Sequence, residues 1–361
     1  MQKSEVKDMD ARKHRETVLK AIRFEKPDYI PMNFVINLAY WNTCEHEALC
    51  DLMEAHPFLF PDFVRPELPM KFEYANVARK DEPYTDDWGC VWSTTMNGIT
   101  GTVTKHPLTD WADYDRYKKP DPNKCMGIGS IDWAAEEQRI AQRKKDGLLT
   151  MEGLRHGHTF LQVCDIHGYE NVLFDMEDEE PMLKKLLTDI TDFNAAILQR
   201  YADMNVDILT VAEDLGMQVG PMLSPQNLAD YILPCYERLA GIAKSSGAIL
   251  HMHSDGDIRT LAGMLMGCGM DVLNLQDLVN GLDWIEENIK GKMCIELDID
   301  RQKVTTYGSP KDIDDLIRQE VKQLGNKQGG LMMIYGLYPG VPPENAAALM
   351  DAMEKYAFYY N

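Results

Sequence analysis

The stretch AILHMHSDGDI, residues 248–258, places two histidines and two aspartates directly after a short apolar run. If this run is a strand, side chains two residues apart point the same way, so His251, His253 and Asp255 share one face. Imidazole and carboxylate groups are common zinc ligands, and we therefore predict that His253 and Asp255 bind a metal ion. The alternative is that His251 packs against neighbouring strands, while the SDGD segment only makes a turn and Asp257 caps the next helix.

Two other apolar runs end in carboxylates. Glu213 and Asp214 end DILTVAEDLG, and Glu296 lies in MCIELDID. Such residues often face solvent or cap helices, but together with a His–Asp pair they would complete a three- or four-ligand site. A zinc ion with one open position activates a bound substrate. We predict Glu213 and Glu296 as the carboxylates that compete for the remaining ligand positions.

Aromatic, histidine and carboxylate side chains elsewhere suggest a pocket for a small, partly apolar molecule. The segment MIYGLYPG contains two tyrosines, EGLRHGHTF contains His156 and a second histidine, and YTDDWGCVW contains two carboxylates beside tryptophans. The alternative for the last segment is a lid packed by its own tryptophans. The predicted catalytic residues are Tyr335 and Asp87, and the predicted substrate contacts are Asp86, Trp88, His158, His251 and Tyr338.

The elements that must position these residues become regular from residue 147. Short apolar runs end in polar or glycine residues and are separated by helical patterns, which is typical of buried parallel strands. The runs are LLTMEG, DILTVAEDLG, AILHMHSDGD, DVLNLQD, MCIELDID and GLMMIYG. So many strand–helix units in series favour a (β/α)8 barrel, a single α/β domain over residues 1–361, with its active site at the carboxyl ends of the strands. No glycine-rich nucleotide-binding motif follows a strand.

The helix starts are well marked. Ser224 precedes Pro225, and Ser309 precedes Pro310, so each pair supplies a capping hydroxyl and a proline at the first helical position. Helices are also predicted over HRETVLKAI and over VPPENAAALMDAMEKY at the end of the chain. The remainder of residues 1–145 is irregular and is predicted to form an N-terminal extension with lid-like loops.

Charge and cysteine content exclude several classes of protein. Of the 361 residues, 58 are acidic and 37 basic, which gives a formal net charge of −21 and makes nucleic acid or an anionic membrane an unsuitable partner. The eight cysteines contain no C-x-x-C pair, and no apolar run approaches the length of a membrane span. We expect a cytoplasmic protein with reduced thiols. The sequence leaves a homodimer open.

Four segments together resemble the uroporphyrinogen decarboxylase superfamily, over nearly the whole chain from about residue 14. They are ETVLKAIRFEKPDYIPMNF, DDWGCVWSTTMNGITGTVTKHPLTDWADYDRYKKPDP, HSDGDIRTLAGMLMGCGMDVLNLQD and GLYPGVPPENAAALMDAMEKY. The resemblance implies a (β/α)8 barrel, in agreement with the strand–helix pattern. One branch of the superfamily decarboxylates uroporphyrinogen without a cofactor, and the other comprises cobalamin-dependent methyltransferases that use zinc.

The chain departs from the decarboxylase branch at two places. That branch has arginines in an early segment that hold substrate carboxylates, but the corresponding segment here, NFVINLAYWNTCEH, contains none. Tyr335 stands where the branch has a late histidine. Asp86 or Asp87 matches its active-site aspartate, yet a substrate with eight carboxylates would meet a strongly acidic protein.

The segment HSDG resembles the H-x-C-G zinc motif of the methyltransferase branch. His253 stands at the histidine and Asp255 where a cysteine would be, and the late cysteine ligand of the branch is also absent. Oxygen ligands in place of thiolates make a harder, more Lewis-acidic ion, suited to an ether or hydroxyl oxygen. The resemblance therefore implies removal of a methyl group from a small methoxylated compound, aromatic ones included, and its transfer to the cobalt of a corrinoid partner protein.

Two other functions remain as alternatives. A cofactor-independent decarboxylase of a porphyrinogen-like substrate would be active without metal or corrinoid. A non-catalytic barrel that binds a corrinoid or tetrapyrrole would show ligand binding without turnover.

Overall fold

The computed structural model describes residues 11–68 and 70–360. The chain divides into two compact units, each described by itself below. The first unit comprises Met1–Lys80, Thr95–Thr100 and Gln276–Asn361, and the second comprises Asp81–Thr94 and Gly101–Leu275.

Four parallel strands form the main sheet of the second unit, in the order β5, β6, β7, β8. Their bounds are β5 (Met151–Gly153), β6 (Ile208–Ala212), β7 (Ile249–Ser254) and β8 (Val272–Gln276). The register places Ala212 beside His253, and His253 beside Asn274. Nearly all residues of β6, β7 and β8 are buried, as in parallel strands that are covered on both faces. The four strands confirm the predictions made from the apolar runs.

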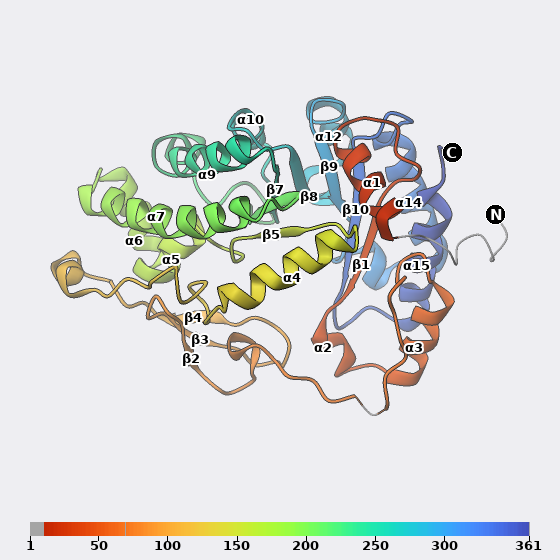
Figure 1. Ribbon diagram of the computed structural model, residues 1–361, viewed down its shortest axis with the longest axis horizontal. Coiled ribbons are helices and arrows are strands. Elements are labelled where there is room, and N and C mark those ends of the chain that lie inside the picture. Colours follow the sequence, from red (N-terminus) through yellow and green to blue (C-terminus); the bar gives the residue numbers. More distant parts are fainter. Residues whose placement is uncertain (1–10, 69, 361) are drawn as a thin grey trace. The chain divides into compact units, whose positions relative to one another are not determined.

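Two helices of this unit precede β5, and the others lie between consecutive strands of the sheet along the chain (Figure 1). They are η2 (Trp111–Arg116), α4 (Trp133–Lys145), α5 (Phe160–His167), α6 (Tyr169–Glu177), α7 (Pro181–Asp203), α8 (Pro225–Asn227), the π-helical turn η3 (Leu228–Ile232), α9 (Leu233–Ser246) and α10 (Ala262–Gly267). In α7, Leu183, Leu187 and Ile190 recur at helical spacing and are buried, and the helix packs along α9. Gly247 ends α9 in the left-handed conformation, at a φ of 77°, which glycine adopts without steric cost.

A smaller antiparallel sheet also belongs to the second unit. It has the order β2 (Tyr84–Thr85), β3 (Val91–Ser93), β4 (Thr102–Lys105). Its first strand leads into the DDWG segment, so this predicted lid-like loop begins on a small sheet of its own.

The first unit contains three parallel strands in the order β1 (Met32–Ile36), β10 (Leu331–Leu337), β9 (Cys294–Asp298). The N-terminal strand β1 therefore pairs with the C-terminal strand β10. The helices are α1 (Ala11–Ile22), α2 (Leu38–Trp41), α3 (His46–Ala55), η1 (Asn76–Ala78), α11 (Asp277–Asn280), α12 (Leu282–Asn288), α13 (Val304–Tyr307), α14 (Pro310–Leu324) and α15 (Pro343–Ala357). Helices α1 and α15 confirm the predictions for the two ends of the chain.

The predicted helix caps are present. The Ser224 hydroxyl accepts a hydrogen bond from the backbone N–H of Asn227, and Ser309 forms a reciprocal capping box with Asp312. The predicted helix start at Asp257 is wrong, because α10 begins at Ala262. The Asp257 carboxylate instead binds the Arg259 guanidinium at 2.7 and 2.9 Å and accepts a backbone hydrogen bond from the same residue, which makes a turn before the helix.

Parallel strands that alternate with helices along the chain give this protein a fold of the (β/α)8-barrel type, which confirms the predicted fold class. All eight cysteines are free, as expected for reduced thiols. Among the described residues, no helix combines the length and the apolar character needed to cross a membrane.

Candidate metal centre

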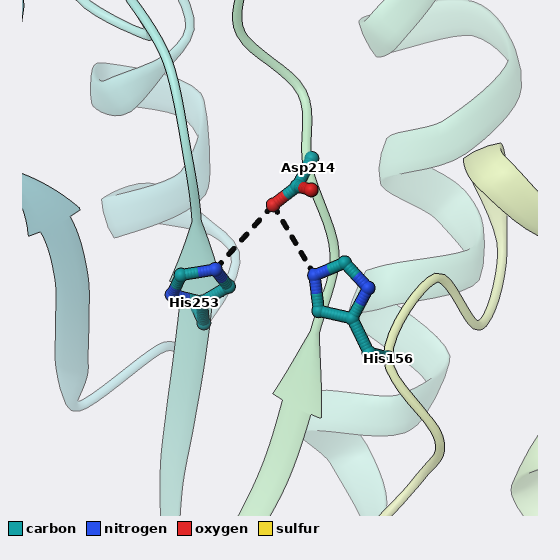
Figure 2. A group of neighbouring side chains, drawn as sticks. All are labelled: His156, Asp214 and His253. Atoms are coloured by element: carbon teal, nitrogen blue, oxygen red, sulfur yellow. Dashed lines mark hydrogen bonds and ion pairs between the residues drawn. The ribbon is translucent and has the colours of Figure 1, made fainter. Parts of the chain in front are cut away.

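Three strand ends of the second unit bring two histidines and an aspartate together. His156 lies three residues after β5, Asp214 lies two residues after β6, and His253 is the fifth residue of β7. Because β5, β6 and β7 are adjacent and parallel, their carboxyl ends lie at one edge of the sheet. Figure 2 shows both imidazoles pointing at the same carboxylate oxygen. We call these three residues the histidine cluster.

The distances in the histidine cluster suit a metal ion. Nε2 of His156 lies 3.2 Å from Oδ1 of Asp214, and Nε2 of His253 lies 3.4 Å from the same oxygen. All three ligand atoms lie within 4.8 Å of one another. In a tetrahedral zinc site with bonds of 2.0–2.1 Å, neighbouring ligand atoms are about 3.3 Å apart. The two distances that involve Asp214 are therefore close to the spacing that a bound zinc ion requires, and the three residues fit the metal by the chemistry of their donor atoms.

The charges around His253 favour its protonated, cationic form. Burial alone lowers the pKa of His253, but the hydrogen bond to Asp214 and the charges of Asp255 and Asp214 outweigh burial and raise this pKa to about 9. For Asp214, burial alone raises the pKa, but hydrogen bonds from His156 and His253 hold it well below its usual range. The cluster thus stabilises a positive charge at its centre, which is the electrostatic requirement of a cation site.

Besides Asp214 and His156, two further residues lie next to His253. Its Nδ1 lies 2.5 Å from Oδ1 of Asn274, on the neighbouring strand β8. Its Nε2 lies 3.7 Å from Oδ1 of Asp255, whose backbone N–H donates to Asp214. Asp255, a predicted ligand, therefore lies at the edge of the cluster, where its negative charge helps to raise the pKa of His253.

A buried arginine fixes the loop that carries His156. The Nε of Arg155 donates to the carbonyl of His156 at 3.0 Å, and its Nη2 donates to Asp165 at 3.1 Å. The guanidinium also lies 5.4 Å from the ring centre of Trp92, within the range of a cation–π interaction. Burial raises the pKa of Asp165 to about 6, against the lowering effect of Arg155.

The predicted ligand Glu213 is oriented differently from Asp214. It is fully buried, and its Oε1 accepts hydrogen bonds from the backbone N–H groups of Thr159 and Leu161, both at 2.9 Å. Its Oε2 accepts a hydrogen bond from the hydroxyl of Tyr236. Glu213 therefore caps the start of α5, whereas the adjacent Asp214 belongs to the histidine cluster.

The predicted substrate contacts Asp86 and Trp88 have partners within the second unit. Asp86 accepts hydrogen bonds from the backbone N–H groups of Trp88 and Cys90 and from the indole N–H of Trp92. Trp88 is buried against Phe193. The neighbouring Asp87, predicted to be catalytic, has an exposed side chain and lines a surface pocket of about 420 Å³. A substrate role for these residues stays a prediction.

The other histidines predicted to contact substrate, His158 and His251, are both buried. Nδ1 of His158 lies 2.7 Å from the hydroxyl of Thr159, and burial lowers the pKa of this imidazole. His251 pairs with Thr210 and Val272 in the strand register, two residues before His253.

Three predicted site residues lie in the first unit. Glu296 is the third residue of β9. The Tyr335 hydroxyl donates to Thr305 at 3.0 Å, and burial raises the pKa of Tyr335 to about 12. Tyr338 is partly exposed, with the Arg301 guanidinium 5.4 Å from its ring centre. Among the described residues, the group that could hold a metal ion does not include Glu296.

Sequence reasoning missed His156 and Asp214 as candidate ligands. Asp214 directly follows Glu213, and the direction of each side chain depends on how the chain turns after β6. His156 lies in an irregular segment between β5 and α5, where no periodicity gives its orientation. The only signal was that both lie just past the end of a strand.

A family model described as uroporphyrinogen decarboxylase (URO-D) matches residues 90–356, well over half of the chain. The chain belongs to the uroporphyrinogen decarboxylase family. Among curated relatives of this family member, the uroporphyrinogen decarboxylase of Trichlorobacter lovleyi is 23% identical over 273 residues, covering 72% of this chain and 74% of the relative. The enzyme of the same name from Geobacter sulfurreducens is 22% identical over the same shares.

The fold is also that of a solved methyltransferase structure. A methyltransferase from Methanosarcina mazei aligns with this family member with a TM-score of 0.66 and 15% sequence identity, covering 95% of this chain and 98% of the other. At this identity the likeness shows the shared fold. The resemblance that the sequence suggests, to the uroporphyrinogen decarboxylase superfamily, is confirmed.

Proposed function

We propose that this protein is a zinc-dependent methyltransferase that removes the methyl group of a small methoxylated compound and transfers it to the cobalt of a corrinoid protein. The observation that carries the proposal is the histidine cluster. His156, Asp214 and His253 offer two nitrogen atoms and one oxygen atom at zinc-ligand spacing, at the carboxyl ends of parallel strands.

The donor set favours an oxygen-containing substrate. Two neutral imidazoles and one carboxylate neutralise less of the charge of a zinc ion than thiolates would, and they leave a fourth position open. Bound zinc would supply Lewis-acid chemistry, drawing electron density from an ether oxygen so that its methyl group is more easily removed. Asp214 and the nearby Asp255 keep this edge of the sheet attractive to cations.

The proposed methyl transfer breaks one bond and forms one bond. In the proposed transfer the bond between the methyl carbon and the ether oxygen would break, and the electron pair of the new bond to the methyl group would come from the reduced corrinoid of the partner protein. The oxygen leaves with the electrons of the broken bond and takes up a proton from solvent. Eight free cysteines agree with the reducing surroundings that cobalt(I) needs, and we place the protein in the cytoplasm within this proposal.

The comparisons support a methyl-transfer enzyme at a coarser level. The family consists of enzymes by name, and a methyltransferase shares the fold over 95% of the chain. Of the residues predicted from the sequence to meet the substrate, Asp87, in the second unit, has a side chain that reaches solvent, and it remains our proposed substrate contact and catalytic residue. The roles of Tyr335 and Tyr338, in the first unit, stay predictions.

The names of the curated relatives favour one alternative, the decarboxylation of a porphyrinogen-like substrate. The absence of arginine from NFVINLAYWNTCEH and the presence of Tyr335 at the late histidine position argue against it. The decarboxylase branch that the sequence resembles works without a cofactor, so it gives no role to three residues at zinc-ligand spacing.

One experiment separates these functions. The purified protein is assayed for bound zinc and then mixed with a cobalt(I) corrinoid and a panel of methoxylated aromatics, methanol and methylamines, while the cobalt absorbance is followed. We expect zinc near one equivalent and methylation of cobalt by methoxylated compounds only. Release of carbon dioxide from uroporphyrinogen without metal would support the decarboxylase instead, and corrinoid binding without turnover would support a carrier.

A further inference from the structure

A buried amide on β8 contacts His253 of the histidine cluster. Strands β7 and β8 are parallel, and the register makes Asn274 the direct neighbour of His253. Asn274 lies between Leu273 and Leu275, both fully buried, and is itself almost completely buried. A polar amide in such a strand needs hydrogen-bond partners, because leaving a buried polar group without one is destabilising.

The contact assigns the two ring nitrogens of His253. Oδ1 of Asn274 lies 2.5 Å from Nδ1, and a carbonyl oxygen can only accept a hydrogen bond. Nδ1 must therefore carry a proton. The other nitrogen, Nε2, faces Oδ1 of Asp214 at 3.4 Å, on the side where His156 also points (Figure 2).

We propose that Asn274 is a positioning residue for the metal centre: its side-chain oxygen holds the Nδ1 proton of His253 and so keeps Nε2 available as the metal ligand. The inference rests on the metal site of the proposed function. Metal-bound histidines commonly donate their second N–H to an outer partner, which fixes the tautomer and the ring orientation. Here the strand register supplies that partner.

A neutral acceptor suits this position. Asp214 and Asp255 already place two carboxylates near Nε2 of His253. A third carboxylate at Nδ1 would add negative charge in a buried position, whereas an amide oxygen accepts the hydrogen bond without adding charge. Asparagine can therefore orient the imidazole ring of His253 without changing the net charge of the metal centre.

The test compares three variants of the full chain by metal binding alone. Asn274→Ala removes the acceptor, and Asn274→Asp keeps an oxygen acceptor in the same place. Asn345→Ala is the matched control, since Asn345 is an equally buried asparagine that donates to the carbonyls of Thr305 and Gly308 in the first unit. Zinc affinity is measured by competition with a coloured chelator, and the ligand field by the visible absorption of the cobalt(II)-substituted protein.

We expect Asn274→Ala to weaken zinc binding by about 10–100-fold and to change the cobalt(II) spectrum, as for other outer partners of metal ligands. Asn274→Asp should recover most of the affinity, and Asn345→Ala should bind zinc like the unmodified protein. Unchanged affinity in Asn274→Ala, or an equal loss in Asn274→Asp, would overturn the inference.

A second measurement needs no substitution. In the zinc-loaded protein, the ¹⁵N shifts of the His253 ring should show a protonated Nδ1 and a metal-bound Nε2, and the reverse assignment would refute the positioning role. Failure of methyl transfer with intact zinc binding would count against the proposed function and leave the role of Asn274 standing. Failure of the unmodified protein to bind zinc or cobalt(II) would overturn both.

Discussion

Two polar clusters, one in each unit, include residues that follow strands, and they differ in how their charges are compensated. The histidine cluster combines cationic and anionic groups, and its side chains are 19–51% exposed. The second group, Asp277, Asp300 and Glu320, consists of carboxyls alone and is buried. We call this group the carboxyl cluster.

The backbone satisfies two of the three members of the carboxyl cluster. Asp277 accepts hydrogen bonds from the N–H groups of Leu278 and Asp300, and Asp300 accepts from residues 302–304. Glu320, in α14, accepts no hydrogen bond from the described residues. Burial first, and then the charge of Asp277, raises the pKa of Glu320 well above its usual range. Burial also raises the pKa of Asp277, so the carboxyl cluster favours a protonated, uncharged carboxyl.

The comparison shows that acidic residues after a strand do not by themselves make a metal site. Where imidazoles face a carboxylate near the surface, the donor atoms can exchange a proton for a metal ion. Where carboxyls face each other in the interior, the low dielectric favours a shared proton. The four predictions below test this difference, from the largest expected effect to the smallest.

The largest effect is expected from Asp214→Asn. The amide removes the anionic ligand between His156 and His253, and we expect zinc affinity to fall by at least about 100-fold, more than for loss of an outer partner. The measurement is chelator competition. The matched control is Glu213→Gln at the adjacent residue, which should lose about 1–3 kcal/mol of unfolding free energy but keep its zinc affinity. Equal losses of affinity in both variants would contradict the assignment of the ligand.

The next effect concerns Glu320 of the carboxyl cluster. Glu320→Ala leaves a cavity beside the buried carboxyls, so we expect a loss of about 2–4 kcal/mol of unfolding free energy in urea. Glu320→Gln keeps the shape and an N–H donor and should stay within about 1 kcal/mol of the unmodified protein. Neither variant should alter zinc binding. A strongly destabilised Glu320→Gln would show that the carboxyl is ionised in the folded protein.

The third prediction uses pH on the metal-free protein. The folded pKa of His253, about 9, exceeds its ordinary value of 6.5. Its ion pair therefore contributes fully below pH 6.5, and up to roughly 3 kcal/mol of unfolding free energy is lost as pH rises to 9. His253→Gln should remove this dependence between pH 6.5 and 9.

The carboxyl cluster should also lose stability as pH rises, but over a lower pH range. The pKa of Glu320 is raised above the ordinary value of 4.5, so the free energy of unfolding should fall once pH exceeds 4.5. Glu320→Gln should remove this pH dependence.

The His253 prediction has its own contrary outcome. If His253→Gln left the pH dependence between pH 6.5 and 9 unchanged, the imidazole would not carry the charge that we assign to it.

The smallest effect is expected from Asp255→Asn. Oδ1 of Asp255 lies 3.7 Å from Nε2 of His253, and the side chain is about one-third exposed. As a neighbouring charge it should change zinc affinity by about tenfold or less, because solvent screens it. A loss as large as that in Asp214→Asn would instead make Asp255 a direct ligand, as the HSDG motif predicts.

Much of the fold could be predicted from the sequence. The apolar runs that end in polar residues became β5 to β10, and Ser224 and Ser309 start helices as their spacing indicates. These features depend on local periodicity and on the hydrogen bonding of one turn, which a single segment contains. The helix start at Asp257 was wrong, because its carboxylate binds Arg259 and Gly220 in a turn and α10 begins only at Ala262.

For the candidate site, the sequence alone placed the candidate ligands at the ends of strands. It identified His253 by the alternation of side chains along β7. Only the tertiary structure decided its neighbours. His156 comes from an irregular loop, Asp214 is turned toward the imidazoles while Glu213 is turned toward α5, and Asn274 reaches Nδ1 through the register of two strands. The physical reason is that a ligand set depends on contacts between segments distant in the sequence, whereas periodicity reports only the direction of side chains within one segment.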